Sequence, residues 1–150
     1  MYLITLEGGD GSGKGTATKM VTEILRQEGA FTSIQVTAEP RRTHPLGRLA
    51  VEAVRTGDAG PLQEAGYFAA DRLDHSHMWI RPRLVLGAAV VSERNVHSSL
   101  VYQGIVGLWN STFDWWIGRD CQRNARPPIA QIFTSTGQLG AGCGYLWGSL

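Results

Sequence analysis

The sequence has little of several features that would by themselves define a class of protein. Its 150 residues contain only Cys121 and Cys143, too few and too far apart for a disulfide framework or a metal cluster. A net charge of +1 gives no excess of positive charge for nucleic acid or an acidic membrane surface. No apolar run is long enough to span a membrane, and a strand predicted from Tyr2 leaves no room for a signal peptide. We therefore expect a cytoplasmic protein with no nucleic-acid or membrane partner.

Charge is also missing from the last part of the chain. The composition as a whole, 43% apolar and 18% charged, is that of one folded domain. After Arg126, however, no charged residue follows, and glycine recurs at Gly137, Gly140, Gly142, Gly144 and Gly148. We expect a folded domain over residues 1–126 and an atypical tail over 127–150, in which residues 129–133 could form a strand. Disorder, poor packing and a truncated or frame-shifted reading frame are the open explanations for this tail.

A glycine-rich loop lies between a predicted strand, residues 2–6, and a predicted helix. The apolar residues of that helix recur on one face and are Ala17, Met20, Val21, Ile24 and Leu25. The loop consists of Gly8, Gly9, Asp10, Gly11, Ser12, Gly13, Lys14, Gly15 and Thr16. Glycines let the backbone wrap around phosphates, so that amide groups and the helix N-terminus face the anion. Lys14 can reach the terminal phosphates, and we predict a nucleotide-phosphate site here.

The residue after Lys14 differs from that of most phosphate loops. It is Gly15, where a serine or threonine hydroxyl usually contacts magnesium, and Thr16 comes one position later. We assign no direct metal ligand, and expect Thr16 and Glu93 to act on a metal through water. The Gly-Lys-Gly-Thr order resembles adenylate kinases and points towards nucleoside monophosphate kinases.

Downstream segments alternate between strand and helix patterns. Strands are predicted over residues 31–38 and 88–91, and helices over 45–56, 61–78 and 98–108. Pro82 marks either a break or a fresh start of a helix. This alternation predicts an α/β fold of the P-loop type, with a parallel sheet and helices on both of its faces.

Three segments resemble the thymidylate (dTMP) kinase family. They are the glycine-rich loop, the sequence FAADR at residues 68–72, and VVSERNVHSSLVYQG at residues 90–104, which is close to VISDRYxxSSLAYQG. Ala38-Glu39-Pro40 resembles part of a fourth motif, REPGGT. The resemblance covers about residues 1–110. It implies a P-loop kinase that transfers the γ-phosphoryl group of ATP to dTMP with Mg²⁺, and it allows a homodimer.

The residue types on two helices suit a pyrimidine nucleotide. Phe68 and Arg72 are four residues apart and share a helix face, so a ring can stack on a base while a guanidinium donates to it. Ser99, Tyr102 and Gln103 share a face of the next helix, and Gln103 can both accept from and donate to thymine. The alternatives are core packing for Phe68 and a solvated helix face for Arg72 and Gln103.

The resemblance assigns roles to these positions. It implies ATP binding by the loop, residues 8–16, and catalytic roles for Asp10, Lys14, Glu93 and Arg94. It implies dTMP binding by Glu39, Phe68, Arg72, Arg94, Ser99, Tyr102 and Gln103. Arginine grips phosphate oxygens bidentately, so Arg94 should hold the monophosphate or the transferred group, the alternative being an ion pair with Glu93.

Some positions depart from the family pattern. The family's phosphate-binding arginine, four residues beyond the glycine of PLG, corresponds to Val51 when counted from Gly47. Arg41 or Arg42 could replace it, whereas Arg48 lies on a different helix face. The arginine that normally precedes the acid of REP is Ala38, and no lid segment is recognisable.

These departures leave two alternatives to dTMP phosphorylation. The first is a kinase for another nucleoside or nucleotide. The second is a fragmentary or degenerate family member that binds nucleotide without catalysis.

Overall fold

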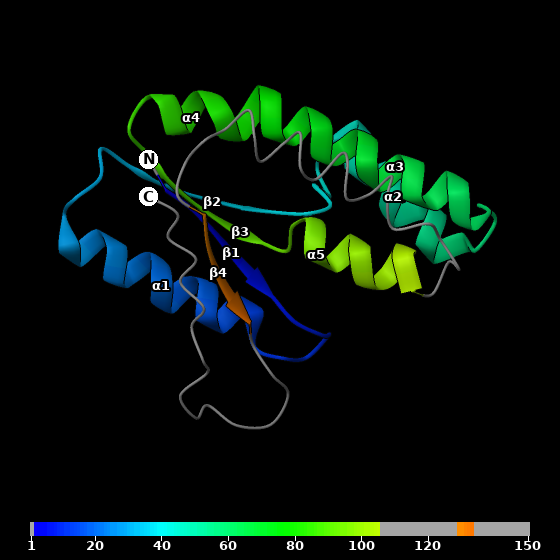
Figure 1. Ribbon diagram of the computed structural model, residues 1–150, viewed down its shortest axis with the longest axis horizontal. Helices are drawn as coiled ribbons and strands as arrows, with labels where there is room; N and C mark the ends of the chain where they lie inside the picture. Colours follow the sequence, from blue (N-terminus) through cyan, green and yellow to red (C-terminus); the bar gives the residue numbers. More distant parts are fainter. Residues whose placement is uncertain (1, 106–128, 134–150) are drawn as a thin grey trace.

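The computed structural model describes residues 2–105 and 129–133 and contains a four-stranded parallel sheet (Figure 1). Its order is β2-β3-β1-β4, and its strands are β1 (Tyr2–Glu7), β2 (Ile34–Ala38), β3 (Ala89–Glu93) and β4 (Ile129–Phe133). Every pair of neighbours is parallel. The predicted α/β fold is confirmed, although β2 begins three residues later than predicted.

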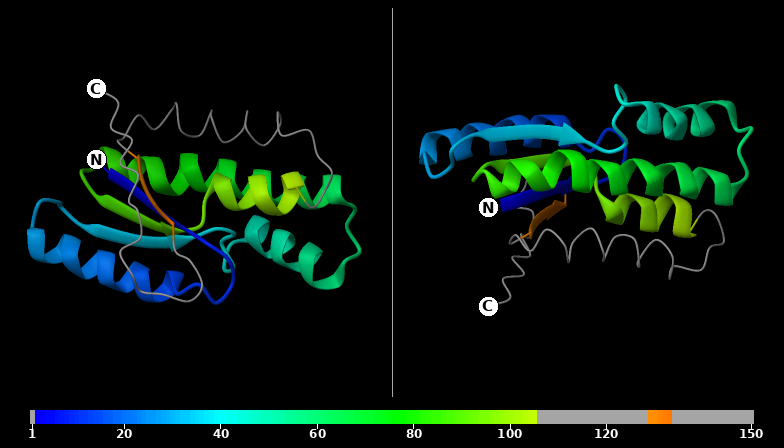
Figure 2. Two further views of the ribbon diagram at one scale, coloured as in Figure 1. Left: turned by 60° about the horizontal axis from the view of Figure 1, so that its bottom comes forward. Right: turned by 90° about the horizontal axis from the view of Figure 1, so that it is seen from above.

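Helices cover both faces of the sheet (Figure 2). Successive residues of a strand point to opposite faces, so that both faces carry apolar side chains that the helices bury. Leu3 pairs with Val90 in register, and both pack against Ile80 on one face. Ile4 pairs with Val91, and both pack on the other face against α1 (Lys14–Glu28). A sheet buried on both sides explains the continuous apolar run in β3.

Helix α1 presents a slightly different face to the sheet from the one predicted. Its apolar residues against the core are Ala17, Val21 and Leu25. Thr18 and Thr22 are buried beside them, whereas Met20 and Ile24 are each 55% exposed, so their prediction as core residues was wrong. Thr22 Oγ1 donates to the carbonyl oxygen of Thr18 at 2.7 Å, which satisfies a buried hydroxyl inside the helix. The helix ends at Gly29, which has φ 65°.

The remaining helices lie mostly on the opposite face. They are α2 (Pro45–Thr56), α3 (Pro61–Asp74), the π-helical segment η1 (His75–Ile80), α4 (Arg81–Val85), α5 (Val96–Ser99) and the π-helical segment η2 (Leu100–Ile105). The segments α3, η1 and α4 follow one another without a break, and Pro82 lies in the first turn of α4, so it marks a fresh start. The helix predicted from Ser98 begins two residues earlier, at Val96, and its predicted last turn lies outside the described residues.

The division of the chain at residue 126 stays a prediction. Strand β4, the strand suggested for residues 129–133, lies beyond that position and pairs with β1 over its full length. The glycine-rich segment from residue 134 onwards lies outside the described residues. Within the part of the chain that is described, no helix has the length and apolar character needed to cross a membrane.

Two helical glycines provide a matched test of the packing of α2. A Cβ on the buried Gly47 would overlap the backbone carbonyl of Arg41, whereas a Cβ on the exposed Gly66 of α3 would meet nothing within 4 Å. We expect Gly47→Ala to lower the free energy of unfolding by about 2 kcal/mol or more. Gly66→Ala should raise it by about 0.5–1 kcal/mol, because alanine is the better helix former. Urea unfolding checks both, and equal effects would contradict the close contact at Gly47.

Candidate functional site

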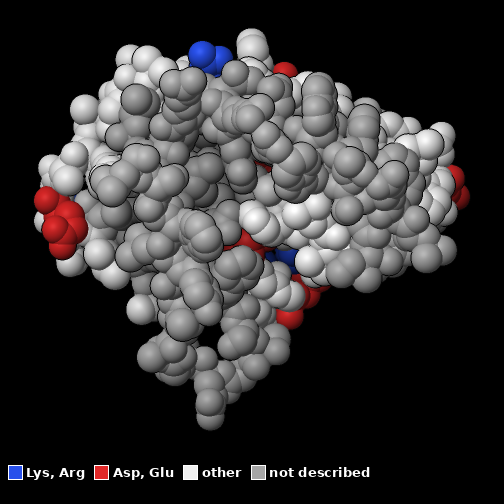
Figure 3. Space-filling view, in the orientation of Figure 1, with Lys and Arg blue, Asp and Glu red and all other residues white. Residues whose placement is uncertain are grey.

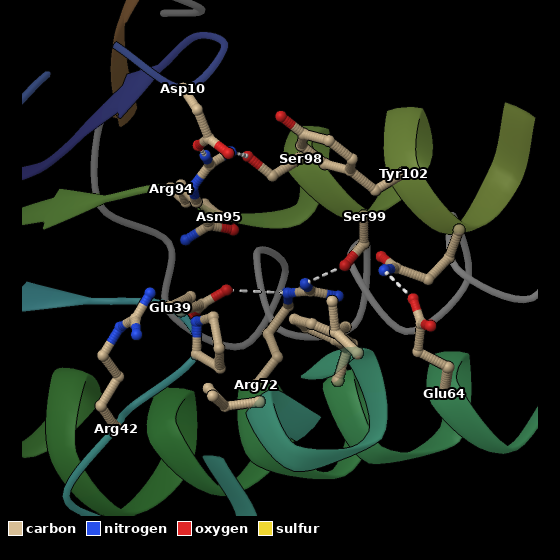
Figure 4. Close-up of a pocket in the computed structure, with 15 residues that line it drawn as sticks. Asp10, Glu39, Arg42, Glu64, Arg72, Arg94, Asn95, Ser98, Ser99 and Tyr102 are labelled. Atoms are coloured by element: carbon tan, nitrogen blue, oxygen red, sulfur yellow. Dashed lines mark hydrogen bonds and ion pairs between the residues drawn. The ribbon is translucent and has the colours of Figure 1, made fainter. Parts of the chain in front are cut away.

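A pocket of about 320 Å³ lies at the carboxyl edge of the parallel sheet (Figure 4). Two backbone hydrogen bonds of 2.9 Å align this edge, from Glu39 N to the carbonyl of Glu93 and from Arg94 N to that of Leu6. The lining residues are Asp10, Glu39, Pro40, Arg42, Val51, Val54, Glu64, Phe68, Arg72, Arg94, Asn95, Ser98, Ser99, Tyr102 and Gln103. Every residue predicted to bind dTMP is among them. In the space-filling view, acidic and basic atoms lie together near the middle of the face (Figure 3).

Arg72 is the buried centre of this pocket rather than part of a solvated helix face, since it is only 2% exposed. Its Nε donates to Glu39 Oε2 at 2.9 Å, and its Nη2 donates to Ser99 Oγ at 2.5 Å. His75 contacts the other oxygen of Glu39 through Nδ1 at 3.2 Å and Thr37 Oγ1 through Nε2 at 2.8 Å. The third guanidinium nitrogen, Nη1, is buried and has no hydrogen-bond partner among the described residues.

The charge of Glu39 is stabilised by its neighbours. Burial raises the pKa of this carboxyl, but the Arg72 charge and the hydrogen bond from His75 outweigh burial and hold the pKa below its usual value of 4.5. His75 was not predicted to belong to the site. Its position three residues after Arg72, which places the two on one helix face, is the signal that could have indicated it.

The amide of Gln103 has a partner within the protein. It is 6% exposed, and its Nε2 donates to Glu64 Oε1 at 2.9 Å. One N–H of the amide is therefore engaged by a protein carboxylate, and the role of Gln103 in accepting from and donating to a base stays a prediction. The amide oxygen remains as the acceptor.

Arg94 joins the glycine-rich loop to the pocket. Its backbone has φ 68°, the only positive φ of a non-glycine residue in the described ranges. Its Nη2 lies 2.5 Å from Asp10 Oδ1, so its ion-pair partner is Asp10 and the alternative of Glu93 was wrong. Its Nη1 donates to Ser98 Oγ at 3.1 Å, and Ser98 donates in turn to Glu7 Oε2 at 2.6 Å. Burial raises the pKa of Glu7.

The loop itself has the geometry of a phosphate cradle. Gly13, at the start of α1, has φ 82°, a conformation that favours glycine. The Lys14 ammonium donates to the carbonyl oxygens of Gly8 at 3.0 Å and Gly9 at 2.6 Å. Partial burial and the nearby Arg94 charge lower the pKa of Lys14. Two carbonyl oxygens of the loop thus hold the lysine ammonium, and phosphate oxygens could replace them as acceptors.

The structure distinguishes the two arginines that could replace the cation absent at Val51. Arg41 is engaged, since its Nη2 lies 2.9 Å from Asp71 Oδ1 and 2.7 Å from Asp74 Oδ2. Arg42 lies at the surface and lines the pocket, as does Val51. Of the two, Arg42 is therefore the one that a ligand in the pocket can contact.

The residues near the loop fit a magnesium ion held mainly by phosphates and water. Among the described residues no group of three or more His, Cys, Asp or Glu side chains could hold a metal ion by itself. However, a Cβ on Gly15 would lie 3.6 Å from Glu93 Oε1, so this carboxylate adjoins the start of α1, next to Thr16. Magnesium commonly takes one or two carboxylates together with substrate phosphates and waters.

The parallel sheet, the glycine-rich loop and the lysine at the start of α1 define a P-loop protein. The chain belongs to the thymidylate kinase family, whose sequence model, described as "Thymidylate kinase", matches residues 6–134.

Two relatives and one solved structure support this assignment. A "Probable thymidylate kinase" of Pyrobaculum calidifontis is 43% identical over 106 residues, covering 70% of this chain and 51% of the relative. A "Thymidylate kinase" of Clavibacter sepedonicus is 43% identical over 103 residues, covering 67% and 47%. The crystal structure of thymidylate kinase from Ehrlichia chaffeensis matches with a TM-score of 0.76 and 25% identity, over 89% of this chain and 74% of that one. The chain spans about half the length of the curated relatives it matches.

Two glutamates that each contact an arginine should contribute differently to stability, because one is buried and the other is exposed. In Glu39→Gln the buried Arg72 loses its counter-charge, and we expect the free energy of unfolding to fall by about 3–5 kcal/mol at pH 7. Glu52→Gln, which removes the exposed partner of Arg55, should change it little.

The pH dependence follows from the lowered pKa of Glu39. The stability that its charge contributes is present above pH 4.5 and is lost as the pH falls through the folded-state value. The difference in the free energy of unfolding between the parent chain and Glu39→Gln should therefore become smaller below pH 4.5. Urea unfolding from pH 7 to about pH 3 measures this, and a difference in unfolding free energy that is independent of pH would contradict it.

Proposed function

We propose that this protein phosphorylates dTMP to dTDP with ATP as the donor. The observation that carries the proposal is the pocket itself, which joins the phosphate loop to a buried arginine with an unused donor. Arg94 and Asp10 lie where the loop meets the pocket, and Arg72 Nη1 is buried without a partner among the described residues. A buried donor without a partner is costly, and a base oxygen in the pocket would satisfy it.

The donor half of the site is the glycine-rich loop. Backbone amides of residues 8–16 and the N-terminus of α1 face an anion, and Lys14 provides the positive charge nearest to the terminal phosphates. Glu93 and Thr16 would hold Mg²⁺ through water, and the ion would neutralise phosphate charge.

The acceptor half of the site holds a monophosphate at one end and a base at the other. Arg94 and Arg42 supply the cations for the acceptor phosphate. Phe68 stacks on the base, and Arg72 donates to a base oxygen. Tyr102 lines the pocket with its ring centroid 5.3 Å from the Arg94 guanidinium carbon, and it would contact the sugar.

Catalysis in such a site consists of positioning and charge neutralisation, because phosphoryl transfer needs little covalent chemistry from the protein. Binding places the acceptor phosphate beside Arg94, which already spans the distance between the loop residue Asp10 and Ser98. Arg94 and Lys14 then neutralise the charge of the group in transfer.

Nucleotide binding without turnover is the second candidate. The presence of Val51 in the pocket lining favours it, since a cation is missing there for the acceptor phosphate. A coupled assay for ADP with dTMP, dUMP, AMP and deoxythymidine as acceptors separates the two functions. ADP formation with dTMP above the other acceptors supports the first, and binding of dTMP without ADP formation supports the second. A homodimer and a cytoplasmic location remain proposals.

Removal of the loop lysine should abolish turnover. We expect Lys14→Ala to reduce kcat by about a hundredfold or more, because a charge that acts on the transferring group is lost. Lys19→Ala, on the exposed side of α1, is the matched control and should retain the parent rate. The coupled ADP assay measures both, and normal turnover in Lys14→Ala would remove the loop from the reaction.

Arg42 should hold the acceptor phosphate. We expect Arg42→Ala to raise the dissociation constant for dTMP about tenfold, through the loss of a charge-assisted hydrogen bond, and to leave ATP binding unchanged. Arg48→Ala, at an exposed position outside the pocket lining, should have little effect on either. Titration calorimetry measures the constants, and equal effects of the two substitutions would exclude a specific role for Arg42.

A further inference from the structure

The contact between Glu64 and Gln103 joins two elements that are distant in sequence. Glu64 lies in the first turn of α3, where a negative charge is favoured by the helix dipole, and Gln103 belongs to η2. Both line the pocket, and Glu64 lies on the side away from Asp10 (Figure 4). The roles described above do not include Glu64.

This contact fixes which end of the amide faces the ligand. An ionised carboxylate only accepts hydrogen bonds, so Gln103 must turn its NH₂ group towards Glu64, as the 2.9 Å contact shows. The opposite rotamer would place the amide oxygen against the carboxylate, which is unfavourable in a largely buried position. Gln103 therefore presents its oxygen as an acceptor.

The same pocket lining contains a buried donor. Arg72 Nη2 contacts Ser99, which precedes Gln103 by four residues and so shares its helix face. The neighbouring Nη1 is the buried donor without a partner among residues 2–105 and 129–133. The pocket lining thus combines a buried donor on Arg72 with an acceptor on Gln103 whose orientation is fixed.

Only one kind of pyrimidine edge complements this pair. Thymine and uracil present a carbonyl oxygen next to a ring N–H, an acceptor beside a donor. Cytosine presents an amino group next to an unprotonated ring nitrogen, which is the reverse. A site built to form hydrogen bonds discriminates strongly against a ligand that leaves its buried groups unpaired.

We propose that Glu64 is a positioning residue that locks the Gln103 amide and thereby selects imide pyrimidines over cytosine. This inference rests on the proposed function, since it requires that a pyrimidine nucleotide occupies the pocket. It adds a residue that sets specificity without touching the ligand.

The test compares dUMP with dCMP, because they differ only at this edge of the base. Calorimetry on the parent chain should show a preference for dUMP of about a hundredfold or more. In Glu64→Gln the new amide can offer either an oxygen or an NH₂ group to Gln103. The side-chain amide of Gln103 can then flip, and the preference for dUMP over dCMP should fall about tenfold. Glu64→Ala removes the lock altogether and should act in the same direction. Glu52→Gln, an exposed glutamate on α2, should keep the parent preference.

Three results would overturn the inference. The first is an unchanged ratio of dUMP to dCMP affinity in both Glu64 variants, including the case in which both affinities fall equally. The second is unfolding of both variants, measured by melting temperature, which would assign Glu64 to stability alone. The third is a parent chain that binds neither nucleotide, which would overturn the proposed function together with this inference. Binding of dUMP with an unaltered preference in the variants would overturn only the inference.

Discussion

The pocket depends on one buried ion pair, between Arg72 and Glu39. The two charges come from separate elements, the end of β2 and helix α3, and Ser99 adds a third element, α5. Removing two charges from water is costly, and the cost is offset only where each charge is also hydrogen-bonded. His75 serves this purpose for Glu39, whereas Nη1 of Arg72 has no partner among the described residues. The interaction that holds the pocket walls together therefore involves the same arginine that we propose contacts the base.

Much of the fold was predictable because its signals are local. Helix α2 has the predicted bounds, since Pro45 lies in its first turn and Gly57 ends it with φ 69°. The loop and the start of α1 were predictable for the same reason, as glycine spacing and the lysine act within a few residues. The residues predicted to bind dTMP, all of which line the pocket, were identified through a family resemblance, which carries long-range information that composition and periodicity lack.

The partners of those residues were not predictable. The sequence does not indicate that Gln103 contacts Glu64, 39 positions away, or that Arg94 contacts Asp10, 84 positions away. The first pair forms where α3 packs against η2, and the second where the ends of β1 and β3 meet, and the identity of the partners depends on side-chain reach. The exposure of Met20 and Ile24 was not predictable either. Periodicity locates an apolar face within about one residue in each turn, and two small threonines decide which edge of that face is buried.

The backbone of Arg94 has a consequence for how this protein can change. A side chain with a Cβ is disfavoured at φ 68°, so glycine would be the more comfortable occupant of that position. Selection for stability alone would favour glycine at this position, and only a functional need for the guanidinium would oppose that change. If Arg94 has the role proposed for it, arginine should persist at this position in relatives that catalyse the reaction, and glycine should be tolerated in relatives that do not.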